Sequence, residues 1–130
     1  MIYLDTSALT KLVLPETETA ALTIWLTNRK QLARLSSEIV HVELVRAVLR
    51  TAPTAHAEVR QLLENLRTIP LTPALLAHAG TMPPPPLRSL DAIHLASALQ
   101  LADHLTAFIA YDHRLADAAE AVGLPVVSPR

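Results

Sequence analysis

The residues of this sequence best suited to chemistry are three aspartates that stand where strands are predicted to give way to helices. Asp5 and Asp112 each end a short apolar run with strand character and precede a helical segment. Asp91 lies in the first turn of an alanine-rich segment predicted to be helical. Any one of them could simply cap its helix, which stabilises a helix by roughly 0.3–1 kcal/mol. Because open α/β sheets bind ligands outside the carboxyl ends of their strands, the recurrence favours one shared site.

A fourth carboxylate, Glu43, lies within a helical segment whose other residues are mostly apolar. At helical spacing it shares a stripe with Arg46 and Arg50. The stripe could be a narrow solvent-facing surface with an internal ion pair. It could equally aim a carboxylate at a site, with arginines near enough to hold an anionic substrate. The spacing alone leaves both interpretations open.

The acidic group, if it converges, indicates a metal. Three or four buried carboxylates cannot all stay ionised side by side without a cation. A cluster of oxygen ligands in a chain without cysteine suits Mg²⁺ or Mn²⁺, in a number of ions that the sequence does not fix. Such ions favour phosphate oxygens, so the predicted chemistry is metal-assisted attack of water on a phosphodiester.

Other catalytic arrangements have weaker support. The six histidines show no metal-ligand spacing. His94 and His113, which flank the acids, could support them, but the favoured interpretation is that they are local polar residues. Ser7 lacks the Gly-x-Ser-x-Gly context of a nucleophile elbow. With only two glycines there is no glycine-rich phosphate loop. Asp117, one turn beyond Asp112, is expected to be solvated or to support the site.

Composition places the chain among single-domain proteins. The 130 residues are 51% hydrophobic with few aromatics, which favours closely packed helices on a core of small residues. No apolar run is long enough to span a bilayer, and no basic segment precedes the first strand, so no signal peptide is expected. The absence of cysteine fits a cytoplasmic protein. Because the net charge is −1, nucleic-acid binding would need a local basic patch.

The chain must position these residues with alternating strands and helices. Strands are predicted near 2–4, 32–35, 68–71, 106–110 and 125–127, with helices between them. This alternation predicts an α/β fold with a central parallel sheet covered by helices on both faces. Pro70 favours an edge position for the third strand. We expect no division of residues 1–130 into further domains.

Serines and prolines supply the predicted boundaries. Ser36 or Ser37 is expected to cap a helix that reaches about Arg50, and Ser89 to cap the helix that carries Asp91. The four prolines at 83–86 are expected to form an extended, polyproline-like spacer.

Four blocks of the sequence together resemble PIN-domain proteins, specifically VapC-type toxin ribonucleases of type II toxin–antitoxin systems. The blocks are YLDTSALTKL, HVELVRA, LRSLDAIHLASAL and YDHRLADAA; they follow the family's order and cover the chain from end to end. The resemblance implies a single PIN domain over residues 1–130 and a three-layer fold. It also implies an endoribonuclease dependent on Mg²⁺ or Mn²⁺, inhibition by a VapB-type antitoxin and a homodimer.

The resemblance also assigns roles by position. The acidic quartet is then Asp5, Glu43, Asp91 and Asp112. Ser7 matches the hydroxyl residue that supports the first aspartate, and Thr6 is a further supporting candidate. The chain departs from the family at Ala110, where threonine is frequent, which is expected to affect the orientation of Asp112 more than activity. The proline run is also unusual and is expected to reshape one rim of the site.

The predicted basic patch consists of Arg46 and Arg50, which follow Glu43 on its stripe, and of Arg88, which precedes Asp91.

Two alternatives to a ribonuclease remain. A phosphotransferase of the haloacid-dehalogenase type also begins with a strand and an aspartate, but it needs a second aspartate two residues later, where Ser7 stands. A catalytically idle PIN-like module could bind RNA or a protein. Retention of all four acids argues against it, since like charges clustered without a metal cost stability.

Overall fold

The computed structural model describes residues 1–130 and contains one sheet of parallel strands. The strands are β1 (Ile2–Leu4), β2 (Arg34–Ser37), β3 (Arg67–Ile69), β4 (Ala107–Ile109) and β5 (Val126–Val127). Their order across the sheet is β3-β2-β1-β4-β5, so β1 is central and β3 lies at an edge, as Pro70 indicated. Every pairing is parallel, which confirms the predicted sheet. The carboxyl ends of all five strands therefore face the same way.

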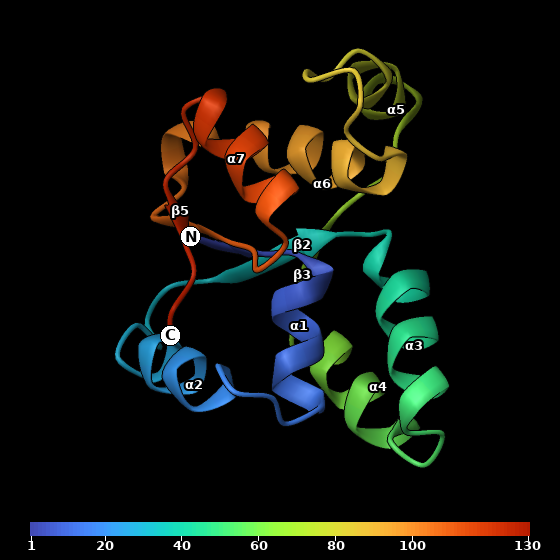
Figure 1. Ribbon diagram of the computed structural model, residues 1–130, viewed down its shortest axis with the longest axis vertical. Coiled ribbons are helices and arrows are strands. Elements are labelled where there is room, and N and C mark those ends of the chain that lie inside the picture. Colours follow the sequence, from blue (N-terminus) through green and yellow to red (C-terminus); the bar gives the residue numbers. More distant parts are fainter.

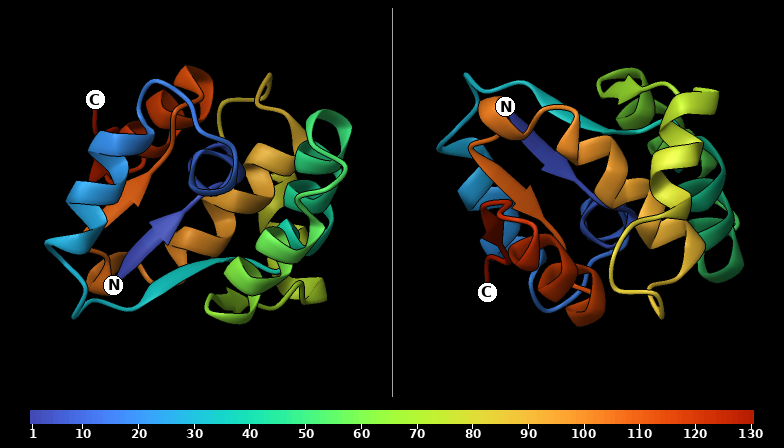
Figure 2. Two further views of the ribbon diagram at one scale, coloured as in Figure 1. Left: turned by 90° about the horizontal axis from the view of Figure 1, so that it is seen from below. Right: turned by 90° about the horizontal axis from the view of Figure 1, so that it is seen from above.

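Seven α-helices cover the two faces of the sheet, which gives three layers (Figure 1). The helices are α1 (Thr6–Val13), α2 (Thr19–Thr27), α3 (Val40–Thr51), α4 (His56–Glu64), α5 (Pro73–Gly80), α6 (Ser89–Leu99) and α7 (His113–Ala121). α1 to α4 lie on one face and α5 to α7 on the other (Figure 1). Views from below and above show β1 lying between β2 and β4 (Figure 2).

The alternation of side chains along each strand divides the core in two. Ile2 and Leu4 of β1 pack with α1 to α4, whereas Tyr3 packs with α5 to α7. In β4, Phe108 joins Tyr3, and the two rings stack with centroids 5.2 Å apart. α6 packs closely because its inward positions are small, as the composition predicted; they include Ala92, Ala96 and Ala98. A larger side chain there would overpack the core, at a cost of about 1–3 kcal/mol.

The predicted serine caps are wrong. Ser36 and Ser37 are buried residues of β2, and Ser36 Oγ donates to the Leu4 carbonyl at 2.6 Å. The hydroxyl thus finds its partner across the sheet, and α3 begins later without a side-chain cap. Ser89 is the first residue of α6 rather than its cap, and Arg88 holds the cap position without a capping bond.

The proline run also differs from its prediction. Instead of an extended spacer it forms a turn, closed by the Leu87 N–H, which donates to the Pro84 carbonyl at 2.9 Å. Leu87 is the first residue after the prolines and so the first with an amide donor to close it. The turn returns the chain from α5 to α6, which pack against each other.

Candidate active site

Asp5 is the most deeply buried of the four acids. It follows β1, caps α1 and is 3% exposed. Its Oδ1 accepts the Ala8 N–H at 2.8 Å, while Ser7 Oγ lies 2.7 and 2.8 Å from its two oxygens. The same Ser7 oxygen accepts the Tyr111 N–H at 2.9 Å, which ties Asp5 to the segment after β4. The predicted supporting contact of Ser7 is present in this geometry.

Asp91 and Asp112 are joined by one arginine. Asp112 caps α7 by accepting the Leu115 N–H, and Asp91 lies in the first turn of α6. Arg88 Nε lies 3.3 Å from Asp91 Oδ2, and its Nη2 lies 3.2 Å from Asp112 Oδ2. The Arg88 side chain is 63% exposed, so each ion pair contributes little stability. Its guanidinium nevertheless supplies positive charge between two carboxylates.

Glu43 projects from α3 and makes no ion pair with either arginine of its stripe. Its Oε1 instead accepts a hydrogen bond from Thr6 Oγ1 at 3.1 Å and lies 2.8 Å from His94 Nε2. Thr6 is thus brought to Glu43 rather than to Asp5. This contact resolves the ambiguity left by the sequence in favour of a carboxylate held toward the other acids.

The four acids lie at the carboxyl edge of the sheet, on four different elements. Glu43 and Asp91 line one cavity of about 280 Å³ together with Arg88, Ser89 and Leu90. Burial raises the pKa of Asp91, and the charge of Asp112 raises it further against the opposing effect of Arg88. Burial likewise raises the pKa of Asp5 to about 6, although His94, Ser7 and the Ala8 amide lower it, and Asp91 adds to the rise.

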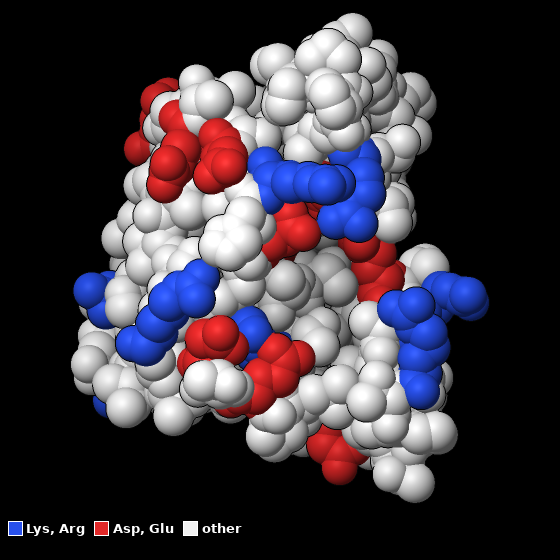
Figure 3. All heavy atoms as spheres, in the orientation of Figure 1, with Lys and Arg blue, Asp and Glu red and all other residues white.

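The carboxylate oxygens of these acids are suitable ligands for a hard divalent cation, but the side chains are not arranged as a preformed coordination site. No three acidic or histidine side chains of the chain form a ready-made metal cluster. All four donors are carboxylates, and the raised pKa values of Asp5 and Asp91 show that their negative charge is costly here. Arg88 contacts Oδ2 of both Asp91 and Asp112, so its charge would compete with a cation held by these two acids. The space-filling view shows basic side chains lying over acidic ones near the centre of this face (Figure 3).

The remaining predicted site residues divide into two groups. Arg46 and Arg50 are exposed and line a cavity of about 450 Å³ with Thr6, Val42, Glu43, Ala47 and Leu90. They therefore lie beside Glu43, at one side of the acidic site. Asp117 is exposed and lines a separate cavity with the proline turn and Arg114; no hydrogen bond or ion pair joins it to the four acids.

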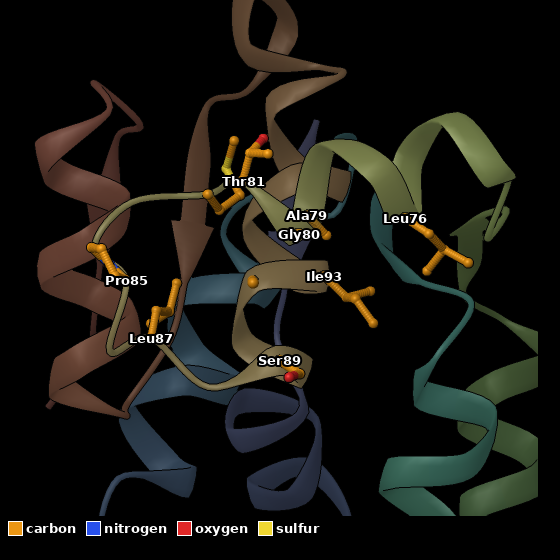
Figure 4. Close-up of a pocket in the computed structure, with 10 residues that line it drawn as sticks. Leu76, Ala79, Gly80, Thr81, Pro85, Leu87, Ser89 and Ile93 are labelled. Atoms are coloured by element: carbon orange, nitrogen blue, oxygen red, sulfur yellow. The ribbon is translucent and has the colours of Figure 1, made fainter.

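A further cavity, of about 470 Å³ and lined by both apolar and polar residues, lies between α5 and α6. Leu76 and Ile93 stand on one side of it, and the proline turn closes the other (Figure 4). None of the four acids lines it.

Sequence reasoning missed one residue of the site. His94 was interpreted as a local polar residue, yet its Nε2 contacts the Glu43 carboxylate. The other five histidines are exposed. The available signal was spacing: His94 follows Asp91 by three residues, which puts both on neighbouring positions of one helix face.

Comparison with known proteins identifies relatives along the whole chain. The family described as PIN domain matches residues 2–121. The chain is 46% identical over 132 residues to Ribonuclease VapC47 of Mycobacterium tuberculosis (strain CDC 1551 / Oshkosh), with 99% of this chain and 97% of that protein covered.

Two solved structures share the fold at low sequence identity. Mycobacterium tuberculosis VapC20, described as a Sarcin-Ricin loop cleaving toxin, superposes with a TM-score of 0.74 at 18% identity, over 99% of this chain and 100% of that one. VapBC2 from Rickettsia felis, bound to a DNA fragment from their promoter, gives a TM-score of 0.73 at 14% identity, with both chains fully covered.

Proposed function

The chain belongs to the PIN-domain family, and on that basis we propose that it is the toxin of a type II toxin–antitoxin pair, a metal-dependent endoribonuclease. The observation that carries the proposal is the gathering of Asp5, Glu43, Asp91 and Asp112 at one edge of the sheet from four elements. The ribonuclease relative, similar over nearly the full length, supports RNA as the substrate. A single PIN domain spans residues 1–130.

The four acids would hold Mg²⁺ or Mn²⁺, which when bound supplies positive charge at the phosphate and lowers the pKa of water. The chain's own residues orient these acids. Ser7 and the Ala8 amide fix Asp5, while Thr6 and His94 fix Glu43. Asp5 and Asp112 are fixed further because each caps a helix with its own side chain.

RNA would reach the acids along the cavity beside α3. Arg46 and Arg50 line it without ion-pair partners, so their charge is available to phosphates. Arg88, which is largely exposed, would bind phosphate once it leaves Asp91 and Asp112. The net charge of −1 makes this local patch the source of RNA affinity.

A toxin of this kind requires a partner that silences it. We assign that role to a VapB-type antitoxin, because the solved neighbour from Rickettsia felis is a VapB–VapC pair. We also expect a homodimer. No helix of the chain is both long and apolar enough to cross a membrane. Cytoplasmic action is proposed because the RNA substrate is there.

The function is tested by incubating the purified protein with labelled RNA and Mg²⁺ or Mn²⁺, and again in EDTA. Cleavage should occur only with metal and should be lost in Asp5→Asn. The matched control is Asp103→Asn, which alters an exposed acid in the short turn of 3₁₀ helix that precedes β4, away from the carboxyl ends of the strands. Wild-type cleavage by Asp5→Asn would refute the site. If the wild-type protein binds RNA but neither cleaves it nor binds Mn²⁺, the catalytically idle module is favoured.

A further inference from the structure

α6 carries a buried histidine, His94, whose ring contacts the carboxylate of Glu43. His94 is 1% exposed, and both of its ring nitrogens are engaged. Nε2 lies 2.8 Å from Glu43 Oε1, and Nδ1 lies 2.8 Å from the Tyr3 hydroxyl. Three residues from β1, α3 and α6 are thus linked in one series of hydrogen bonds, which is buried at Tyr3 and His94 and partly buried at Glu43.

The partner of Nε2 fixes that nitrogen as a donor. Glu43 Oε1 is a carboxylate oxygen and only accepts, so Nε2 is assigned the proton. The Tyr3 hydroxyl, which can donate or accept, is the partner of Nδ1. The Tyr3 ring is itself fully buried and stacked on Phe108, while the His94 ring meets it edge-on with an interplanar angle of 84°. The imidazole is therefore held at both ends and cannot turn away from Glu43.

This arrangement saturates only one oxygen of Glu43. Thr6 Oγ1 and His94 Nε2 both contact Oε1, at 3.1 and 2.8 Å, whereas Oε2 has no hydrogen-bond partner in the chain. The carboxylate is therefore anchored through one oxygen and offers the other to a ligand. Because Asp91 precedes His94 by one helical turn, α6 carries one acid and orients another.

We propose that His94 is a positioning residue for Glu43, acting as a donor that holds Oε1 so that Oε2 is presented to the divalent cation of the site. The inference rests on the proposed metal-dependent function. β1 then sets two acids: it carries the chain directly into Asp5, and through Tyr3 and His94 it fixes Glu43. Ligand-orienting hydrogen bonds of this kind typically change metal affinity by roughly 10–100-fold when they are removed.

Three variants separate positioning from packing. His94→Leu removes the donor and keeps an apolar side chain in the core. His94→Gln keeps an N–H donor near the place of Nε2. Tyr3→Phe removes only the hydroxyl that fixes the ring. Mn²⁺ affinity is measured by titration calorimetry, kcat and KM by RNA cleavage, and folding by thermal unfolding in EDTA.

His94→Leu should weaken Mn²⁺ binding at least about 10-fold and lower kcat by a similar factor, with KM for RNA unchanged. The unfolding temperatures of the variants in EDTA should not fall in parallel with their Mn²⁺ affinities. His94→Gln should recover most of the Mn²⁺ affinity. Tyr3→Phe should bind Mn²⁺ several-fold more weakly than wild type. A purely structural histidine would instead change the unfolding temperature in both His94 variants and leave Mn²⁺ affinity alone.

Equal Mn²⁺ affinity and kcat in wild type and His94→Leu would overturn the proposal. If His94→Leu fails to fold, Tyr3→Phe and His94→Gln decide it, since wild-type Mn²⁺ affinity in Tyr3→Phe would equally refute the role. Failure of the proposed function is recognised separately. It would appear as wild-type protein that binds Mn²⁺ and cuts no RNA, in which case the affinity comparison still tests His94.

Discussion

The guanidinium of Arg88 lies 3.2 Å from the carboxylate of Asp112, although 24 residues separate the two in sequence. The same side chain reaches Asp91 through Nε at 3.3 Å. Arg88 therefore acts as an internal counter-ion for two of the four acids. A divalent cation that uses these acids must compete with a charge that the chain itself provides.

Removal of that competitor should tighten metal binding. Because exposed ion pairs are worth about 0–1 kcal/mol, Arg88→Ala should raise Mn²⁺ affinity by no more than roughly 5-fold per pair. It should also weaken RNA binding and flatten its salt dependence, by a slope of roughly 0.7 for single-stranded RNA. Arg67→Ala is the control, because Arg67 is an exposed arginine at the amino end of the edge strand β3, whereas the acids lie at the carboxyl ends of the strands. Unchanged metal affinity and salt slope would count against the counter-ion.

Asp5 should make the metal-free fold less stable as the pH rises. Its pKa is about 6 in the folded chain against 3.8 for an unperturbed aspartate, so between these values the native state binds more protons than the unfolded state. Its favourable contribution is complete below the lower value and is lost as pH rises to the higher one. The loss is about 3 kcal/mol, from about 1.4 kcal/mol per pKa unit.

Asp5→Asn removes this titration. In EDTA the variant should therefore gain stability over wild type between about pH 4 and about pH 7.5. Urea unfolding of both proteins at several pH values measures the difference. A stability difference that does not change with pH would show that Asp5 ionises as freely in the folded chain as in the unfolded one.

Ser7 should control how readily Asp5 ionises. Ser7→Ala removes the hydroxyl between Asp5 and the Tyr111 amide and leaves that amide unpaired, at a cost of about 1–3 kcal/mol. Because the Ser7 hydrogen bond lowers the pKa of Asp5, its loss should move the acid limb of the pH–rate profile upward. Thr10→Ala is the control, since Thr10 also bonds its hydroxyl within α1, to the Thr6 carbonyl, without touching Asp5. The same shift in both variants would assign the effect to α1 as a whole.

The products should carry 5′-phosphate and 3′-hydroxyl ends. Attack by the RNA 2′-hydroxyl would need acid–base groups near the phosphate. His94 is the histidine in contact with an acid, and both of its nitrogens are already bonded. Water is therefore the expected nucleophile, and EDTA should stop the reaction until Mg²⁺ or Mn²⁺ is restored. End-group analysis decides, and cyclic 2′,3′-phosphate ends would contradict the mechanism.

The sequence predicted the sheet well because its strands are short apolar runs bounded by clear helix signals. Asp5 and Asp112 were located by that pattern alone, and both indeed cap helices while facing the site. Thr72 caps α5 with its own side chain, and Pro73 is the first residue of that helix, which is a local capping signal of the same kind. Features that depend on residues close together in the chain could thus be predicted from the sequence.

The errors concern contacts made across the fold. Ser36 looked like a cap because it lies between a predicted strand and a predicted helix, but its actual partner is a carbonyl 32 residues away. The role of His94 depends on Tyr3 and Glu43, which are distant in sequence and meet only when β1, α3 and α6 have packed. The resemblance to a family assigned roles to acids that the pattern had already located, whereas the contact between His94 and Glu43 becomes visible only in the folded chain.

The pairing of β1 with β4 also sets when the site comes into being during synthesis. Asp5 is made long before Ile109, whose carbonyl its amide bonds, and Asp112 follows Ile109. Chains are synthesised from the N-terminus, and contacts between distant segments form only after both have emerged. The four acids can therefore assemble only after the segment from β4 to Asp112 has been synthesised. Until then the nascent chain holds an incomplete form of the proposed metal site.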